Sequence, residues 1–205
     1  DRFGYAKTID LPTFERNKEA ALAENKYVFT CKNTGKICIF TDMGQLYTVK
    51  AADLPFGKFR DKGIPIDNVS GYDTAKERII CAASQSELNL YRIAFVTEQA
   101  MLKIVDRGGF DVSKRSVAAT KLQENDRVLL VEVIKDQRNM ILQSRDAYFL
   151  RFALEEIPDK KKNAIGVRGM KLGAGDLLEE AYLTQAISDR SIVYKEKTIE
   201  LNKLK

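Results

Sequence analysis

Residues 36–49 read Lys-Ile-Cys-Ile-Phe-Thr-Asp-Met-Gly-Gln-Leu-Tyr-Thr-Val, and this stretch decides the class of fold. Two short apolar runs, Lys36–Phe40 and Leu46–Val49, flank a polar turn that contains Gly44. Runs of this length, rich in β-branched and aromatic residues and separated by a glycine-containing turn, are typical of paired antiparallel strands. The segment therefore predicts a hairpin, and the same pattern recurs along most of the chain.

Short strand-like runs follow one another through the sequence. They are Tyr27–Cys31, Arg78–Cys81, Leu90–Val96, Leu102–Val105, Val128–Val133 and Tyr148–Phe152. The first faces Lys36–Phe40 across Asn33–Gly35, a turn whose Asn and Gly tolerate a positive φ, so these two runs are expected to pair. Helical periodicity is scarce, and its best candidate is Glu15–Asn25. Many short, regularly spaced strands predict an all-β sandwich, barrel or propeller.

An internal repeat decides among these three architectures. Four segments share an apolar strand, a short polar turn and a second strand, and their equivalent first residues are Asp1, Thr41, Thr97 and Ser144. The steps between these residues are about 40, 56 and 47, which is the range of one four-stranded propeller blade. A Lys-Leu-x-x-x-Asp turn before a new strand also occurs twice, at 121–126 and 171–176.

The tail supplies a further hairpin-like segment, Ser191–Leu201, about one step after the fourth repeat. Closed propellers commonly pair their last segment with their first, because this removes exposed strand edges. The prediction is four full repeats and a partial fifth that closes against the N-terminal strand. No Pro/Gly/Ser-rich linker interrupts residues 1–205, so they are expected to form a single domain.

Composition narrows the class of function. The 205 residues contain 34 Lys and Arg against 29 Asp and Glu, a net charge of +5 with a pI near 9.0, which is compatible with a polyanionic partner. No stretch approaches the roughly 18 apolar residues that span a bilayer, so no membrane partner is expected. The chain opens without an initiator Met, in the alternating run Arg2–Lys7, as expected of a fragment from a longer polypeptide.

Residues for common catalytic and metal chemistry are few. The chain has no His, which excludes Ser-His and Cys-His pairs, and it has no P-loop or dinucleotide fingerprint. Cys31, Cys38 and Cys81 lie in strand-like surroundings without the Cys-x-x-Cys spacing of a zinc site. They are expected to be small buried side chains in a reducing cytoplasm. We expect no catalytic residue, no metal and no cofactor in this chain.

Positive charge gathers in one kind of loop. The loop of the first repeat, residues 15–26, has no net charge, whereas residues 56–63, 103–121 and 159–171 carry +2, +3 and +4, together more than the +5 of the whole chain. In a ring of blades, a repeated loop position forms a stripe around the rim. A basic stripe is what binding to DNA phosphates requires, because it neutralises the backbone without reading bases.

The predicted DNA-binding residues are the basic side chains of these three loops, together with the basic residue in the second strand of the fourth repeat. They are Lys58, Arg60, Lys62, Lys103, Arg107, Lys114, Arg115, Lys121, Arg151, Lys160, Lys161, Lys162, Arg168 and Lys171. Glycines in the loops, among them Gly63 and Gly166, would let backbone amides approach phosphates closely. Phe56 and Phe59 are expected to pack beneath their loop rather than to stack on bases.

The repeats resemble the C-terminal domain of the A subunit of bacterial type IIA topoisomerases, the family of DNA gyrase and topoisomerase IV. The resemblance is carried by Gly4–Thr8, Thr41–Gly44, Lys62–Ile66 and the two Lys-Leu-x-x-x-Asp turns, and it covers nearly the whole chain. It implies an all-β, propeller-like β-pinwheel of about four to five four-stranded blades that exchange strands between neighbours. It also implies a basic rim that binds and bends double-stranded DNA.

The resemblance further implies a division of labour. The domain itself is non-catalytic, while the parent protein is an ATP-dependent type II DNA topoisomerase that holds ATP and Mg on other domains. The implied partners are double-stranded DNA, the ATPase B subunit, and the catalytic core of the same A subunit, in the bacterial cytoplasm and associated with the nucleoid.

One departure separates the two branches of the family. Gyrases carry a Gln-Arg-Arg-Gly-Gly-Lys-Gly box in the loop of the first blade, whereas the corresponding segment here, residues 14–23, has no Gly and no net charge. This favours a topoisomerase IV-like domain. Two alternatives stay open: a gyrase A wrapping domain whose first blade is trimmed, and, in a different class, a propeller that serves as a platform for acidic protein partners.

Overall fold

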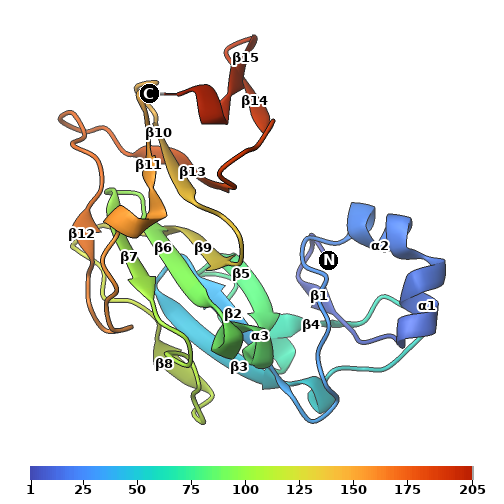
Figure 1. The fold of residues 1–205 in the computed structure, drawn as a ribbon. Coiled ribbons are helices and arrows are strands. Elements are labelled where there is room, and N and C mark those ends of the chain that lie inside the picture. The colour runs from blue at the N-terminus through green and yellow to red at the C-terminus, as the bar shows by residue number, and fades with distance from the viewer. Residues whose placement is uncertain (205) are drawn as a thin grey trace. The chain divides into compact units, whose positions relative to one another are not determined.

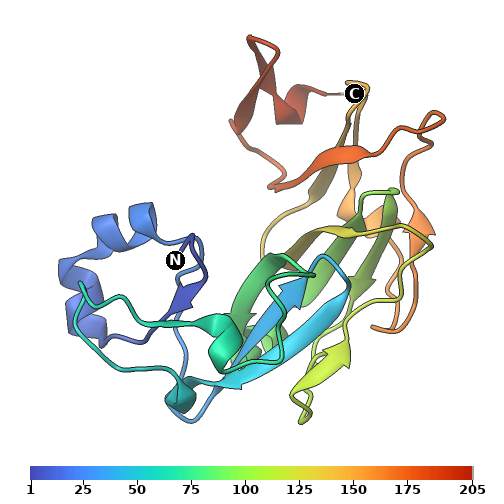
Figure 2. The ribbon, with the colours of Figure 1, turned by 180° about the vertical axis from the view of Figure 1, so that it is seen from behind.

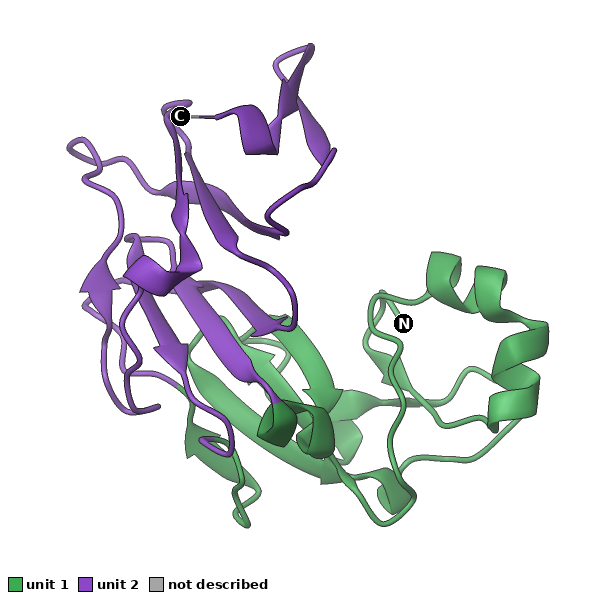
Figure 3. Ribbon diagram, viewed as in Figure 1, with its two compact units in different colours: residues 1–90, 110–119 green, residues 91–109, 120–205 purple. Residues whose placement is uncertain are grey.

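The computed structural model describes residues 1–204, and antiparallel strands dominate it (Figure 1). Internal contacts divide the chain into two compact units (Figure 3). Unit 1 comprises Asp1–Leu90 with Phe110–Ala119, and unit 2 comprises Tyr91–Gly109 with Thr120–Lys205. The prediction of an all-β fold is confirmed, and the prediction of a single domain stays a prediction. No helix in the described residues is long and apolar enough to cross a membrane.

Unit 1 is built on a four-stranded antiparallel sheet in the order β5-β2-β3-β8, whose first three strands lie side by side in both views (Figures 1 and 2). A two-stranded sheet, β1-β4, accompanies it. The elements of this unit are β1 (Tyr5–Ala6), α1 (Leu11–Arg16), α2 (Lys18–Glu24), β2 (Lys36–Thr41), β3 (Gln45–Lys50), η1 (Ala51–Asp53), β4 (Ile64–Pro65), η2 (Ile66–Asn68), β5 (Ile79–Ser84), α3 (Gln85–Leu90) and β8 (Ser116–Ala118).

Unit 2 contains a four-stranded sheet in the order β12-β7-β6-β9, a three-stranded sheet in the order β11-β10-β13 and the hairpin β14-β15. Its elements are β6 (Arg92–Thr97), β7 (Met101–Val105), β9 (Val128–Ile134), β10 (Asn139–Ser144), β11 (Phe149–Ala153), η3 (Leu154–Glu156), β12 (Val167–Arg168), β13 (Leu178–Thr184), β14 (Ser191–Tyr194), β15 (Lys197–Glu200) and η4 (Leu201–Lys203).

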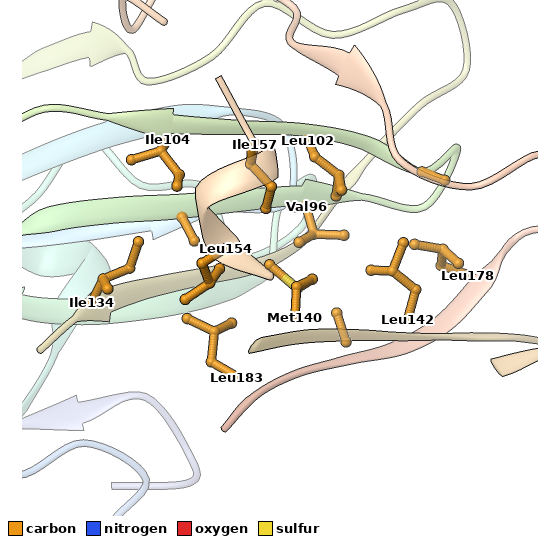
Figure 4. Packing of buried hydrophobic residues seen from close by; sticks show 13 residues of the cluster. Val96, Leu102, Ile104, Ile134, Met140, Leu142, Leu154, Ile157, Leu178 and Leu183 are labelled. Atoms are coloured by element: carbon orange, nitrogen blue, oxygen red, sulfur yellow. The ribbon is translucent and has the colours of Figure 1, made fainter. Parts of the chain in front are cut away.

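Each unit has its own apolar core. In unit 1, Ile37, Ile39 and Val49 of the central hairpin pack with Leu54 and Ile66. In unit 2, the apolar faces of the two sheets meet, and the side chains of the core point toward one another from both (Figure 4). The members of this second core that Figure 4 labels are Val96, Leu102, Ile104, Ile134, Met140, Leu142, Leu154, Ile157, Leu178 and Leu183. Burial of this apolar surface is the main force that holds the sheets together.

The predicted equivalence of Asp1, Thr41, Thr97 and Ser144 is confirmed in atomic detail. In each repeat the side-chain oxygen of this residue accepts a hydrogen bond from the backbone N–H four residues later, at distances of 2.9, 3.4, 3.1 and 3.3 Å. The residue before that N–H always has a positive φ, and it is Gly4, Gly44, Ala100 or Ala147. The four turns are therefore one structure repeated, which is why Thr, Ser or Asp recurs at this spacing.

Strands are exchanged between successive repeats, as the resemblance implies. After each hairpin the chain forms a loop and then adds a short strand to the sheet of the preceding repeat. In this way β4 follows the β2-β3 hairpin and pairs with β1, β8 follows β6-β7 and pairs with β3, and β12 follows β10-β11 and pairs with β7. The sequence marks each of these loops by its basic residues.

Three local predictions need correction or refinement. Tyr27–Cys31 belongs to no strand and does not pair with Lys36–Phe40, whose partners are β3 and β5, although its side chains alternate between half-buried and exposed as those of a strand would. The helix expected over Glu15–Asn25 exists as two short helices, α1 and α2, broken at Asn17. The tail forms the expected hairpin, β14-β15, and β1 pairs with β4, while closure of the tail against the opening strand stays a prediction.

Candidate nucleic-acid interface

The three basic segments predicted to bind DNA overlap with loops at the same topological position. Residues 54–63 follow β3 and η1, residues 106–115 follow β7, and residues 157–166 follow β11 and η3. Each loop ends where the chain enters the exchanged strand, β4, β8 or β12. The repeated position expected from the charge pattern is therefore present in the topology of both units.

Most of the predicted residues present their side chains to solvent. The exposed ones are Lys58, Arg60, Lys62, Arg107, Lys114, Arg115, Lys121, Lys160, Lys161, Arg168 and Lys171. In the described part of the chain none of these side chains is held in an ion pair with an acidic group. Exposed and free of ion pairs, these groups can approach a polyanion, and among them the ammonium of Lys62 lies 4.2 Å from the centre of the Tyr5 ring.

Three predicted residues are placed differently. The side chain of Lys103 is completely buried, so its prediction as a DNA-facing residue is wrong. Its register in β7 pairs it with Phe95 of β6, on the face of the strand opposite Leu102 and Ile104, and burial lowers the pKa of its ammonium group to about 8. Arg151 is half-buried, and its Nε donates to the Leu204 carbonyl at 2.8 Å. Lys162 is half-buried, with its Nζ 3.5 Å from the Gly109 carbonyl.

Backbone geometry explains two of the loop glycines. Gly63 and Gly166 have φ values of 81° and 102°, and a Cβ at either position would collide with a backbone carbonyl, that of Ala6 or that of Leu102. Glycine is needed there because the chain must turn tightly against the strand that it is about to pair with. This structural requirement accounts for both residues without any contact to phosphate.

The two Phe residues of the first basic loop differ in their exposure to solvent. Phe59 is half-buried and lies under the ammonium of Lys7, 5.7 Å from Nζ to the ring centre. Phe56, also expected to pack beneath the loop, is instead 71% exposed, so that expectation is wrong. An exposed ring two residues before Lys58 can stack on a flat apolar surface. In the sequence Phe59 is flanked by Lys58 and Arg60, whereas Phe56 lies between Pro55 and Gly57.

Sequence reasoning misses one residue that shapes the interface. Lys7 is not among the predicted residues, yet its Nζ donates to the carbonyls of Lys58, Phe59 and Asp61 in the first basic loop. The available signal is its place in the repeat, six residues after Asp1, immediately after β1. Lys103 has the same place, six residues after Thr97, in β7.

Comparison with known proteins assigns the repeats to a family. The family model described as DNA gyrase C-terminal domain, beta-propeller, matches residues 35–74, 92–135 and 138–184. These stretches contain the three hairpins β2-β3, β6-β7 and β10-β11.

Relatives of known sequence are A subunits of gyrase. The A subunit of DNA gyrase from Helicobacter pylori (strain ATCC 700392 / 26695) is 28% identical over 189 residues, which are 85% of this chain and 23% of the relative. Its counterpart from Lawsonia intracellularis (strain PHE/MN1-00) is 22% identical over 201 residues, 92% of this chain and 24% of the relative. The chain thus spans about a quarter of the length of these relatives.

Solved structures show the same fold. The C-terminal domain of DNA topoisomerase IV superposes with a TM-score of 0.76 at 23% identity, over 92% of this chain and 60% of that one. The E. coli ParC C-terminal domain gives a TM-score of 0.68 at 16% identity, over 87% and 75%. The likeness confirms the propeller-like fold. Since the family model matches most of the chain, hairpin by hairpin, the chain belongs to the family of DNA gyrase C-terminal β-propeller domains, parts of type IIA topoisomerase A subunits.

Proposed function

We propose that this chain is a non-catalytic module that binds and bends double-stranded DNA. The observation that carries the proposal is the set of exposed, unpaired basic side chains on loops that all follow the second strand of a repeat. Such side chains bind phosphates and position a duplex without recognising its sequence. Membership in the gyrase C-terminal family supports this function, because the relatives are named as DNA gyrases and a DNA topoisomerase.

The parent protein, in this proposal, is the A subunit of an ATP-dependent type II topoisomerase acting on the bacterial nucleoid. This chain presents a bent DNA segment to the catalytic core of the parent protein, while the ATPase B subunit supplies the nucleotide chemistry. We assign ATP and Mg to those other parts, since the contribution expected of this chain is its basic loops.

Within the family, we assign the chain to the topoisomerase IV-like type. The segment that would carry a glycine-rich basic box in gyrase folds here as α1 and α2, with three acidic and three basic residues over positions 15–26. The amides after the first turn of each helix bind within the helix, and residues 14–23 contain no Gly at which the backbone could approach a phosphate closely. Strong wrapping of DNA around the whole domain is not expected without this contact.

Salt dependence tests the DNA-binding function. With about five phosphates neutralised, log affinity for a 30–40 bp duplex should fall with log salt at a slope near −4.5, a loss of several hundredfold between roughly 50 and 200 mM. Absence of binding at low salt, or an affinity that does not change with salt, would reject DNA as the ligand and favour a protein-interaction platform.

A topological assay tests the assignment to the topoisomerase IV-like type. A nicked plasmid is ligated in the presence of saturating domain, and the change in linking number is measured after the protein is removed. We expect tight binding with little change in linking number. A strong positive shift, as complete right-handed wrapping produces, would assign the chain to the gyrase type.

A further inference from the structure

Lys103 is a charged residue in the middle of a hydrophobic sheet. It lies between the core residues Leu102 and Ile104 in β7, and its side chain is completely buried. Its ammonium donates three hydrogen bonds to backbone carbonyls of one loop: Lys162 at 2.6 Å, Ala164 at 2.9 Å and Lys161 at 3.3 Å. It also lies 5.2 Å above the centre of the Phe95 ring. All three N–H donors of the ammonium are used, which offsets the cost of burying the charge.

A similar set of hydrogen bonds occurs in unit 1 around Lys7, whose side chain is half-buried where that of Lys103 is fully buried. Its Nζ donates to the carbonyls of Lys58, Phe59 and Asp61. The accepting residues have the same spacing as those of the other loop, 58, 59 and 61 against 161, 162 and 164. Lys7 follows Ala6, which pairs with Ile64, as Lys103 follows Leu102, which pairs with Val167. In both loops a glycine with positive φ comes two residues after the third carbonyl.

The remaining basic loop, residues 106–115, shows that the fold does not require a lysine at this position. The residue at the corresponding register of β3 is Tyr47, which pairs with Ser116 of β8. Loop 106–115 is held from elsewhere, by the Nζ of Lys36 and the Nε2 of Gln85, both of which donate to the Val112 carbonyl. In β11 the corresponding residue is Leu150. An apolar or aromatic side chain at this position is therefore compatible with the blade.

The buried ammonium has a direct consequence for the loop that it holds. Loop 160–164 carries three consecutive lysines, whose mutual repulsion and side-chain entropy oppose an ordered conformation. Three carbonyls bound to one internal cation fix the backbone, and Lys160 and Lys161 are left exposed. The same reasoning applies to Lys58, Arg60 and Lys62, which are exposed on the loop that Lys7 holds.

We propose that Lys103 and Lys7 are positioning residues for DNA binding: each holds the backbone of one basic loop from the inside, so that the loop's exposed basic side chains meet the phosphates together. This inference rests on the proposed DNA-binding function. It predicts that removal of either lysine weakens DNA binding although neither ammonium contacts DNA.

The test compares the wild-type chain with Lys103→Met, which keeps the length of the side chain and removes the charge and the donors. Without DNA, amide hydrogen exchange in residues 160–166 should accelerate at least tenfold, while exchange in β6 and β9 stays unchanged. With a 30–40 bp duplex, affinity should fall about tenfold, and the magnitude of the salt slope should decrease by about one to two phosphates, at about 0.9 each. Lys7→Met should accelerate exchange in residues 58–63 and lower the affinity and the salt slope in the same way. If Lys103→Met does not fold, Lys7→Met alone tests the positioning role.

A matched control separates positioning from general stability. Leu183→Ala removes apolar volume from the core of the same unit, at a position in β13 outside the loop. It should lower the melting temperature and leave the affinity and the salt slope within twofold of wild type, measured well below that temperature. Unchanged exchange in the lysine variants, or an equal loss of salt slope in Leu183→Ala, would overturn the proposal. If wild type itself does not bind DNA, the proposed function fails, and hydrogen exchange alone still decides whether the lysines hold the loops.

Discussion

The helical segment Leu11–Glu24 and the loop 157–166 follow the second strand of a repeat, yet they differ in almost every physical respect. The helical segment satisfies its backbone through helical hydrogen bonds, and the side chain of Asp10 caps its first turn by accepting from the N–H of Thr13 at 2.6 Å. The loop has no such regular structure, and its carbonyls bind the ammonium of Lys103.

The two regions also differ in net charge. Acidic and basic side chains balance over residues 15–26, whereas residues 159–171 carry +4. A helical pair with balanced charge has no net charge for a polyanion to neutralise, while a loop dense in lysine is stabilised by an internal anchor and gains from an external anion. The ability of a loop at the repeated position to bind DNA therefore depends both on its net charge and on the contacts that hold its backbone.

The largest expected effect is the loss of the three consecutive loop lysines. Replacing Lys160, Lys161 and Lys162 with Ala should weaken DNA binding about 10²-fold near 0.1 M salt and reduce the magnitude of the salt slope by roughly two to three, because each phosphate contact contributes about 0.9 to it. Duplexes of different sequence should be affected alike, since phosphates carry no base identity. Fluorescence-anisotropy titrations at several salt concentrations measure this effect. A loss confined to one sequence would show that the loop reads bases.

The path of the loop backbone gives the second prediction. Gly166→Ala places a Cβ against the Leu102 carbonyl at φ 102° and should cost about 2–3 kcal/mol of the free energy of unfolding, measured in urea. Gly108→Ala is the matched control, because Gly108 also has a positive φ, 72°, but open space where the Cβ would lie. It should cost about 1 kcal/mol. Equal costs would mean that the close approach of the exchanged strand to β7 is not tight.

Local features of the chain can be predicted from the sequence. The four turns are predictable because a side-chain oxygen followed by a residue able to adopt positive φ is a property of five consecutive residues, as in Thr41 to Gln45. Most strands are predictable because apolar runs fix which residues face a core. The basic loops are predictable for a similar reason, since charge density is read directly from the chain.

Features that depend on distant partners cannot be predicted in this way. Tyr27–Cys31 alternates like a strand because an extended segment packed on a core alternates whether or not a neighbour pairs with it. The role of Lys103 cannot be read from its neighbours in the sequence. The three carbonyls that bind its ammonium lie 58 to 61 residues away. The local hint is its place inside Met-Leu-Lys-Ile-Val, a run otherwise made of core residues.

The third prediction uses the pKa of Lys103 to distinguish the two regions by pH. Burial lowers the pKa of this ammonium to about 8, whereas in the unfolded chain it keeps its ordinary value of 10.5. Between these two values the unfolded state binds more protons, so the contribution of Lys103 to stability rises with pH. From pH 7 to pH 10 the wild type should gain about 1–3 kcal/mol in free energy of unfolding relative to Lys103→Met. A constant difference over this range would show that the ammonium is not desolvated.

The smallest expected effect is in the helical segment. Replacing Arg16 and Lys18 with Ala should change DNA affinity by less than twofold and leave the salt slope unchanged. Both side chains are exposed, but the acidic residues of the same segment cancel their charge, and Arg16 Nη2 donates to the Thr13 hydroxyl at 3.2 Å.

The control for this variant is charge-matched. The double change Lys58→Ala with Arg60→Ala removes the same two positive charges from a loop that Lys7 holds, and it should reduce the magnitude of the salt slope by about two. A long-range field that depends only on net charge would make the two double variants equal, since each lowers the charge of the chain from +5 to +3. A held basic loop predicts unequal effects, because only groups placed on a phosphate release its counterions. Equal losses of affinity and slope would therefore remove the distinction between the helical segment and the basic loops on which the DNA-binding model depends.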